Sequence, residues 1–464
     1  MRFNLRTVLP LTFAAVMLLS PLAAAFAVSI PPPNPATQAL ACGSTIVGTV
    51  TITGPQVPCA LSPYITIGAP SLVVTCVGPA LIPSTTGSGI GIYNPGFAGV
   101  TIIGCTVKGF ATGIEIKGAA KNTLASDRAA SDTGDGFYIL SSTGTVLTKD
   151  ISTLNGGDGF DFSGSSSSVL IGNLAKSNIG GGFSFSGDTS DTLKINTATG
   201  NTAGGFDFSG SSLGALSSNS AKSNTGSGFS FTSDTFDIVK TNAAIGNTIN
   251  GFVLSGSSYE VLTGNTATGS TASNDGFLVN GISSGNTLGA NTALKNGVDG
   301  IQIVSSSGNL ISSNGATKNG HDGIELDTTA NNVLVSNRVP ANGYDGIQLV
   351  SSNSNWVYLN DASCAPSSSG TTTACNGNDG IELDGSNSNY LVLNIASYDH
   401  NNGIRLDATS GTSGMNVMSS NTESYNGHYD REDDSTGGPG TLGTWNIWIG
   451  DISVTNITFP AGLP

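Results

Sequence analysis

The stretch GFDFSGSSLGALSSNSAKSNTGS, residues 205–227, is a 23-residue phrase that recurs along most of the chain. Its opening glycine, always followed by Phe or Ile, returns in a nearly constant register. The series is Gly113, Gly136, Gly159, Gly182, Gly205, Gly228, Gly251, Gly276, Gly300, Gly323, Gly346, Gly380 and Gly403. Its longest step, from Gly346 to Gly380, is 23 residues plus an 11-residue insertion. Such a period is typical of a solenoid, in which each repeat buries its apolar face only against its neighbours.

Fixed positions within the phrase predict its local structure. Apolar and polar residues alternate in GFDF and similar phrases, so each should form a short strand with one buried face. Most copies have Leu, Ile or Val eleven residues after the glycine, and Asn fourteen after it. Gly, Ser and Asn between these positions favour turns. The sequence therefore predicts an all-β, single-stranded parallel β-helix of about 14–15 coils, with stacked aliphatic, aromatic and Asn side chains.

The two ends of the chain differ from the repeats. Residues 1–27 carry Arg2 and Arg6 and then an apolar run, the pattern of a secretory signal peptide. We expect an N-terminal cap with the first coils over 28–88, the β-helix over 89–426 and a C-terminal cap over 427–464. After the signal peptide, no apolar run is long enough to cross a bilayer, so the protein is expected to be secreted or held at the cell surface.

The net charge and the cysteines indicate which partners and which cellular compartment to expect. The formal net charge of −15 argues against nucleic acid as a partner, because its phosphates require a basic surface. The six cysteines suit an oxidising compartment. The expected disulfides are Cys42–Cys59 and Cys364–Cys375, each closing a short loop. Cys76 and Cys105 lie in similar apolar phrases, and could either pair across neighbouring coils or remain buried thiols.

The phrase G-[FI]-x-[FL], followed by Ser-Ser, [VL]-[LI]-x-x-N, x-A and x-x-N, resembles the right-handed parallel β-helix repeats of the pectate lyase-like superfamily. It is most similar to NosD-like proteins and to the repeats of alginate epimerases. The resemblance covers roughly residues 42–450 and implies a right-handed β-helix that acts on or binds polysaccharide. The paired Asp motifs of polygalacturonases are absent from the sequence, so the resemblance leaves the reaction open.

Charged residues gather on one predicted surface near the C-terminal end. Residues two and four after each glycine should point outward on the same face of the strand. In the last coils these positions hold Glu325, Asp327, Glu382, Asp384, Arg405 and Asp407. Asp345, before its glycine, and Tyr344 stand at the edge of this surface. We expect Glu325, Asp327, Asp345 and Tyr344 to contact substrate.

The remaining charged residues suggest a possible reaction. Glu382, Asp384 and Asp407 could hold Ca²⁺, which prefers several carboxylate oxygens. Resemblance to pectate lyases then implies a uronate bound to Ca²⁺, with Arg405 or His400 removing the α-proton. A hydrolase would instead use two of the carboxylates as acid and base.

Two classes of function remain open from the sequence. One is a secreted β-helix protein that binds an extracellular polysaccharide and cleaves or epimerises it. The other is a non-catalytic structural or adhesive surface protein, in which Glu382 and Arg405 form an ordinary salt bridge between coils and the Asp before each glycine only shapes a turn.

Overall fold

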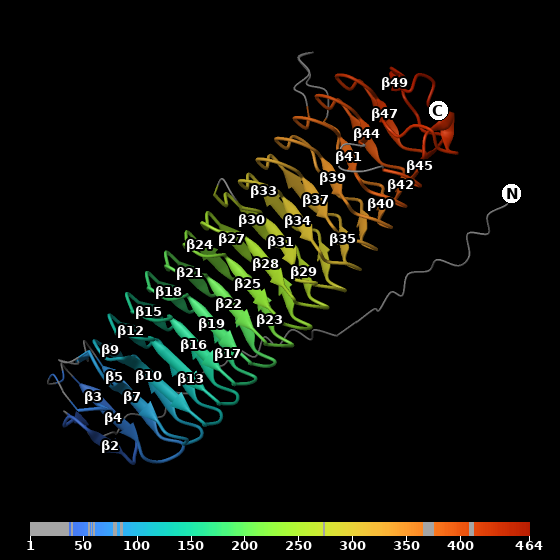
Figure 1. Cartoon of the computed structure of the whole chain (residues 1–464). Coiled ribbons are helices and arrows are strands. Elements are labelled where there is room, and N and C mark those ends of the chain that lie inside the picture. The colour runs from blue at the N-terminus through green and yellow to red at the C-terminus, as the bar shows by residue number, and fades with distance from the viewer. Residues whose placement is uncertain are drawn as a thin grey trace. The chain divides into compact units, whose positions relative to one another are not determined.

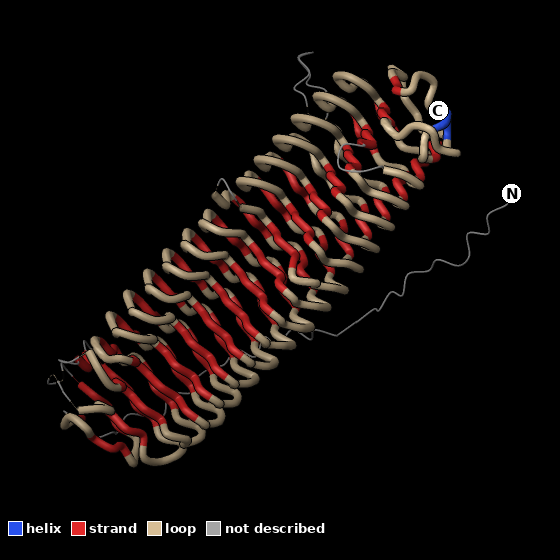
Figure 2. The backbone as a smooth tube through the Cα atoms, in the orientation of Figure 1, coloured by secondary structure: helices blue, strands red, loops and turns tan. Residues whose placement is uncertain are grey.

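The computed structural model describes residues 37–464 apart from 39, 54–55, 57, 59–60, 78–80, 84–86, 272–273, 365–374 and 408–412. The expected signal peptide and Cys59 lie outside the described residues. In the described part, short parallel strands and turns alternate along every coil (Figures 1 and 2). The prediction of a parallel β-helix is confirmed.

The first sheet contains the strands that follow the repeat glycines, and every neighbouring pair is parallel. These strands are β2 (Ser44–Ile46), β4 (Ile65–Ile67), β7 (Ile90–Asn94), β10 (Thr112–Lys117), β13 (Phe137–Leu140), β16 (Phe160–Ser163), β19 (Phe183–Ser186), β22 (Phe206–Ser209), β25 (Phe229–Thr232), β28 (Phe252–Ser255), β31 (Phe277–Asn280), β34 (Ile301–Val304), β37 (Ile324–Asp327), β39 (Ile347–Val350), β41 (Ile381–Asp384), β44 (Ile404–Asp407), β47 (Arg431–Asp433) and β49 (Thr458–Phe459).

The second sheet is 18-stranded and carries the Leu positions of the repeat. Its strands are β1 (Thr37–Gln38), β3 (Val50–Thr53), β5 (Val73–Val77), β8 (Thr101–Ile103), β11 (Thr123–Ala125), β14 (Val146–Thr148), β17 (Val169–Ile171), β20 (Thr192–Lys194), β23 (Ala215–Ser217), β26 (Ile238–Lys240), β29 (Val261–Thr263), β32 (Thr287–Gly289), β35 (Leu310–Ser312), β38 (Val333–Val335), β40 (Trp356–Tyr358), β42 (Tyr390–Val392), β45 (Val417–Ser419) and β48 (Ile447–Ile449).

The third sheet carries the small residue of the repeat and has 11 strands. They are β6 (Leu81–Pro83), β9 (Thr106–Lys108), β12 (Arg128–Ala130), β15 (Ile151–Thr153), β18 (Leu174–Lys176), β21 (Thr197–Thr199), β24 (Ser220–Lys222), β27 (Ala243–Ile245), β30 (Thr266–Thr268), β33 (Thr292–Leu294) and β36 (Gly315–Thr317). Single bridges through Arg338 and Asp361 lead on to the pair β43 (Ile395–Ser397) and β46 (Thr422–Ser424). One 3₁₀ turn, η1, spans Thr441–Gly443.

The solenoid has about 17 turns, so the expected number of 14–15 coils is too low. The missing turns lie at the ends, where strands stack without the repeat glycine. β2 and β4 precede the glycine series, and β47 pairs with β44 although Asp430 occupies the glycine position. Counting glycines therefore missed coils whose backbone hydrogen bonds continue the stack.

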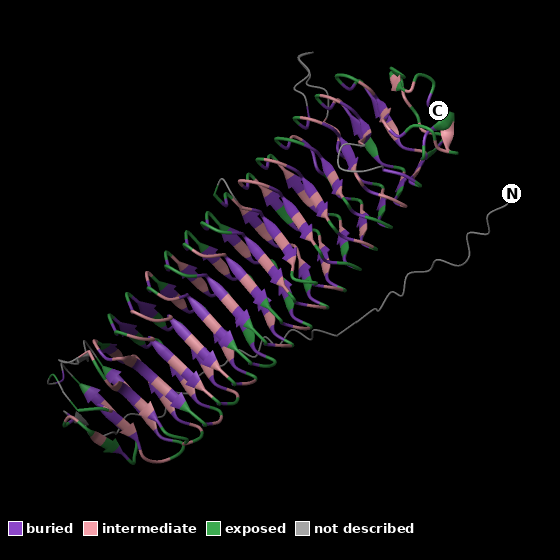
Figure 3. Cartoon of the chain, viewed as in Figure 1, coloured by how far each residue is buried: buried purple, intermediate pink, exposed green. Residues whose placement is uncertain are grey.

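Like side chains stack inside the solenoid, as expected. In the first sheet, buried residues alternate with more exposed ones along most strands (Figure 3). Phe160, Phe183, Phe206 and Phe229 are fully buried, and their ring centroids are 4.7–4.8 Å apart in neighbouring coils. This separation matches the spacing between hydrogen-bonded strands, so each ring packs on the next without voids.

The Asn residues fourteen positions after the glycine form a buried amide ladder. The Asn219 Oδ1 accepts hydrogen bonds from the backbone N–H of Asn196 at 2.9 Å and from its Nδ2 at 3.0 Å. The Asn219 Nδ2 donates to the carbonyl of Leu193 at 3.0 Å and to Asn242 Oδ1 at 3.0 Å. The ladder thus satisfies turn groups that the sheets leave unpaired, and the predicted Asn stacking is confirmed.

Two disulfides join described residues. Cys364 and Cys375 are bonded across the insertion, as predicted. Cys76 and Cys105 are also bonded, with Cα atoms 4.8 Å apart, because they lie on neighbouring coils. Both bonds are consistent with an oxidising compartment. Within the described residues, no helix is long and apolar enough to cross a membrane.

At its N-terminal end the amide ladder contains two carboxylates, Asp127 and Asp150, in place of Asn. Their burial predicts that the stability of the folded protein depends on pH. Asp150 is buried, its Oδ1 accepts the N–H of Asp127 at 2.7 Å, and its Oδ2 has no hydrogen-bond partner among the described residues. Burial, followed by the charge of Asp127, raises the pKa of Asp150 well above its usual range. A folded pKa above the unfolded value of about 3.9 stabilises the protein below that pH, and the stabilisation is lost as pH rises through the folded pKa.

We therefore expect Asp150→Asn to stabilise the protein at pH 8 by about 1–3 kcal/mol, and to change it little near pH 4. The introduced amide would face the carbonyl of Leu124, as the Asn173 Nδ2 faces the carbonyl of Leu147 at 3.1 Å. Urea denaturation at both pH values measures the difference. Asn173→Asp, which adds a carboxylate to the same ladder, is the matched variant and should act in the opposite direction. Equal stabilisation by Asp150→Asn at pH 4 and pH 8 would show that the effect does not depend on the ionisation of Asp150.

Candidate functional site

Amides and charged groups alternate in one row on the outer side of the first sheet. We call Gln302, Glu325, Gln348, Glu382, Arg405 and Glu432 the Gln/Glu row; each pairs in register with the next. The Gln302 Nε2 donates to Glu325 Oε2 at 2.6 Å, and the Gln348 Nε2 donates to Glu382 Oε2 at 2.8 Å. Because an amide lies between Glu325 and Glu382, these two carboxyl groups are not direct neighbours along the row.

Arg405 lies at the centre of a carboxylate cluster. Its guanidinium lies 3.1 Å from Glu382 Oε1, 3.0 Å from Asp407 Oδ2 and 3.2 Å from Glu432 Oε2. Asp434 Oδ2 is 3.9 Å away. Although burial lowers the pKa of Arg405, Asp407 and the other acids outweigh it and raise the pKa above its ordinary value. The guanidinium therefore stays protonated, and its surroundings give no support to the expected role as a base.

A second row of acids runs beside the first, at the residue before each repeat glycine. We call Asp275, Asp299, Asp322, Asp345 and Asp379 the aspartate row; all five are buried. The Oδ1 of each of the first four accepts the backbone N–H of the next row member, as at Asp345, which accepts from Asp379 at 2.7 Å, and the Asp379 Oδ1 accepts the N–H of Asn402 at 2.7 Å. The expected turn function of these residues is thereby confirmed. In the described structure the Oδ2 of Asp345 has no hydrogen-bond partner.

The two rows interact and perturb each other's acidity. Burial, a hydrogen bond with Asp299 and the charge of Asp299 raise the pKa of Glu325 to about 8. Burial and the charges of Asp322 and Glu382 raise the pKa of Asp345 well above its usual range. Burial raises the pKa of Asp379 to about 7. At neutral pH Glu325 is therefore largely a neutral acid that can donate a proton.

His321 compensates the middle of the aspartate row. Its Nδ1 lies 2.9 Å from Asp322 Oδ2 and 3.4 Å from Asp299 Oδ1. The hydrogen bonds to Asp299 and Asp322 raise the pKa of His321 to about 11, so the imidazole is a cation at neutral pH. Its ring stacks on Tyr344, with centroids 4.7 Å apart, and Tyr344 remains half exposed.

The structure brings together some of the predicted residues and separates others. Glu325, Asp327, Tyr344 and Asp345 lie on two neighbouring coils, and Asp327 accepts a hydrogen bond from Thr328 Oγ1 at 2.7 Å. His400 is exposed in the turn before β44.

The three residues expected to bind Ca²⁺ have other neighbours. Asp407 forms an ion pair with Arg405, and Asp384 is paired in register with Asp407. Glu382 instead lies in a group with Asp345 and Asp379, whose ligand atoms lie within 4.8 Å of one another; Asp135, Asp158 and Asp161 form a second such group of acids. Of the three residues expected to bind Ca²⁺, Glu382 therefore lies beside two members of the aspartate row.

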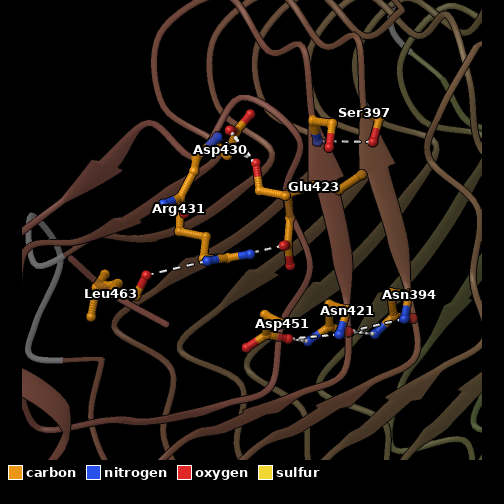
Figure 4. Close-up of polar contacts among 12 residues, drawn as sticks. Asn394, Ser397, Asn421, Glu423, Asp430, Arg431, Asp451 and Leu463 are labelled. Atoms are coloured by element: carbon orange, nitrogen blue, oxygen red, sulfur yellow. Dashed lines mark hydrogen bonds and ion pairs between the residues drawn. The ribbon is translucent and has the colours of Figure 1, made fainter. Parts of the chain in front are cut away.

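Several charged residues of the last coil were not identified from the sequence. Glu432 and Asp434 complete the cluster around Arg405. Arg431 and Glu423 occupy the interior Ile and Ala positions, paired in register with Ile404 and Ala396, and form an ion pair inside the solenoid (Figure 4). The glycine series ends at Gly403, and the next coil is offset by 27 residues, so continuing the rows past Gly403 would have found them.

A family model described as "right handed beta helix region" matches residues 88–249 and 237–362, more than half of the chain. The chain therefore belongs to the right-handed β-helix family, as the repeat phrase predicted. No protein with a curated description matches it in sequence.

Three solved structures illustrate the likeness. The Dettilon tailspike protein is 17% identical with a TM-score of 0.44, and the match covers 57% of this chain but only 60% of the tailspike. The periplasmic alginate epimerase AlgG is 14% identical, with 83% and 78% coverage and a TM-score of 0.38. The Azotobacter vinelandii mannuronan C-5 epimerase AlgE6 A-module is 13% identical, with 88% and 91% coverage and a TM-score of 0.30. At these scores the likenesses carry no argument about substrate or activity.

Proposed function

We propose that the protein is secreted, with residues 1–27 as its signal peptide, and that it binds an extracellular polysaccharide along the Gln/Glu row. The observation that carries the proposal is the alternation of amide and acid groups in register over successive coils. An extended polymer lying along this row would meet a hydrogen-bonding group at every coil, about 4.8 Å apart. Glu325, Asp327, Asp345 and the exposed Tyr344 flank that path.

The charge of the site favours a neutral, hydroxyl-rich polymer. Hydroxyl groups donate hydrogen bonds to carboxylates and amide oxygens. The cations that contact the two rows in the described structure, Arg405 and His321, are already paired with carboxylates. A polyuronate would therefore meet net negative charge, which its own carboxylates oppose.

Glycosidic cleavage is a second candidate, favoured by the raised pKa of Glu325. A carboxylic acid with a pKa of about 8 can protonate a leaving oxygen at neutral pH. Asp327, which follows two residues later on the same face, could be the second carboxylate that such a hydrolysis needs.

We predict that wild-type protein binds a neutral polysaccharide more tightly than a polyuronate, and that Glu325→Ala weakens this binding about tenfold or more, since a hydrogen bond to an acid is lost. Affinity electrophoresis in gels containing each polymer measures the effect. Glu115→Ala is the matched control, because Glu115 occupies the same position of the repeat but lies toward the N-terminal end, outside the Gln/Glu row. Cleavage would be established if the wild type released reducing ends from the polymer and Glu325→Gln did not. If no polymer retards the wild type, or if the two Ala variants behave alike, the proposal fails and a structural role is favoured.

A further inference from the structure

The negative charge of the aspartate row exceeds what its turns require. Asn250 precedes the row and its Oδ1 accepts the N–H of Asp275 at 2.8 Å. Asn402 follows the row and its Oδ1 accepts the N–H of Tyr429 at 3.0 Å. An amide therefore makes the same turn hydrogen bond without placing a charge in a buried position. Burying five consecutive carboxylates as anions is costly, so their charge must be compensated by bound protons, by cationic side chains or by a ligand.

The compensation is incomplete where the aspartate row meets Glu382. Asp345, Asp379 and Glu382 are 0%, 0% and 5% exposed, and one ligand oxygen from each lies within 4.8 Å of the other two. The Asp345 Oδ2 is buried and has no hydrogen-bond partner among the described residues. A buried carboxylate oxygen without a donor, in a residue grouped with two other buried acids, favours a bound cation.

The nearby cations leave this group undercompensated. His321 contacts Asp299 and Asp322, one coil away from Asp345. Arg405 contacts Glu382, but it is shared with Asp407, Glu432 and Asp434. The Asn378 Nδ2 donates to Asp345 Oδ1 at 2.9 Å and to Asp379 Oδ2 at 3.3 Å, which supplies hydrogen bonds without positive charge.

We propose that Asp345, Asp379 and Glu382 bind a divalent cation of the Ca²⁺ class between two coils. Ca²⁺ lies about 2.3–2.6 Å from its oxygen ligands, so oxygens on opposite sides of it are separated by about 4.6–5.2 Å. One ligand oxygen from each of the three residues lies no more than 4.8 Å from the other two, so a single Ca²⁺ could contact all three. Mg²⁺ dehydrates reluctantly and is usually bound through one or two carboxylates, so a group of three carboxylates favours Ca²⁺. Water would complete the coordination.

The ion would join the coils on either side of the insertion. Asp345 and Asp379 are 34 residues apart but adjacent in the row, and Cys364–Cys375 closes the loop between them. Binding would therefore stabilise the folded solenoid where the regular 23-residue step is interrupted.

Protein freed of metal with a chelator tests the proposal without any polysaccharide. We expect Ca²⁺ to raise the thermal unfolding temperature by several degrees, and Mg²⁺ to raise it less. We also expect Tb³⁺ bound in place of Ca²⁺ to luminesce on tyrosine excitation, because Tyr344 precedes Asp345. Asp345→Asn should keep or increase the stability of the metal-free protein, and weaken Tb³⁺ binding about tenfold or more.

Asp275→Asn is the matched control, since it makes the same change in the same row outside the group. It should leave the Ca²⁺ response intact. The proposal is overturned if Ca²⁺ neither shifts unfolding nor competes with Tb³⁺, or if the two Asn variants lose the response equally. Because the assay contains no glycan, its failure would not bear on polysaccharide binding.

Discussion

Glu423→Ala and Arg431→Ile should each destabilise the C-terminal coils by about 3–5 kcal/mol, whereas the double variant should recover most of the loss. The Arg431 Nε lies 3.0 Å from Glu423 Oε2, and NH1 donates to the carbonyl of Leu463 at 3.2 Å (Figure 4). Both side chains are buried. Removing one partner leaves a charge inside the solenoid, while the pair Ala and Ile restores the residue types found at Ala396 and Ile404 in the preceding coil.

The two single variants should differ in their pH dependence. Burial, with the charge of Asp451, raises the pKa of Glu423 to about 8, and because Arg431 lowers this pKa, loss of Arg431 would raise it further and leave the acid neutral at pH 6. After loss of Glu423, the charge of Arg431 cannot be removed in the same way, because a guanidinium does not lose its proton in proteins. We therefore expect Glu423→Ala to be the more damaging change at pH 6, and Arg431→Ile to worsen as pH rises.

Trp448 provides the local measurement. It is 2% exposed and its Nε1 donates to Asp433 Oδ2 at 2.9 Å, in the same terminal coil. Denaturation followed by tryptophan fluorescence, together with hydrogen exchange of β47, reports the end of the solenoid separately from its middle, as repeat proteins require. Additive losses in the double variant would show that the two charges do not stabilise each other.

Asn219→Ala should destabilise the middle of the solenoid by roughly 4–6 kcal/mol. The variant leaves the buried N–H of Asn196 without an acceptor, which costs about 1–3 kcal/mol, and removes three further hydrogen bonds of about 1 kcal/mol each. The loss is large because each ladder member serves two neighbouring coils.

Chemical denaturation monitored by circular dichroism measures this effect, with Ser218→Ala as the control. Ser218 is the adjacent turn residue, and its Oγ makes an exposed contact with Thr241 Oγ1 at 3.3 Å. A loss for Asn219→Ala below about 1 kcal/mol would mean that water replaces the amide, which its burial opposes.

In the candidate site, the repeat period predicts which residues are neighbours in register but not which side chains interact. The register of Glu325, Glu382 and Arg405 follows from the repeat period, and the salt bridge between Glu382 and Arg405 is present as expected. The partners chosen by individual side chains do not follow from it. Glu325 interacts with Asp299 of the preceding coil rather than with a carboxylate of its own row. Such a choice depends on side-chain torsions, which a period does not encode.

The sequence by itself determined the solenoid. A constant 23-residue period places identical side chains one strand spacing apart, so Phe206 must stack on Phe183 and Asn219 on Asn196 once any coil forms. Only the tertiary structure decided which charges meet. It placed Glu382 with Asp345 and Asp379, and it continued the stack beyond Gly403 through a coil that lacks the glycine. Backbone register is fixed by repetition, whereas contacts between rows depend on how each side chain leans and on what the neighbouring coil leaves unpaired.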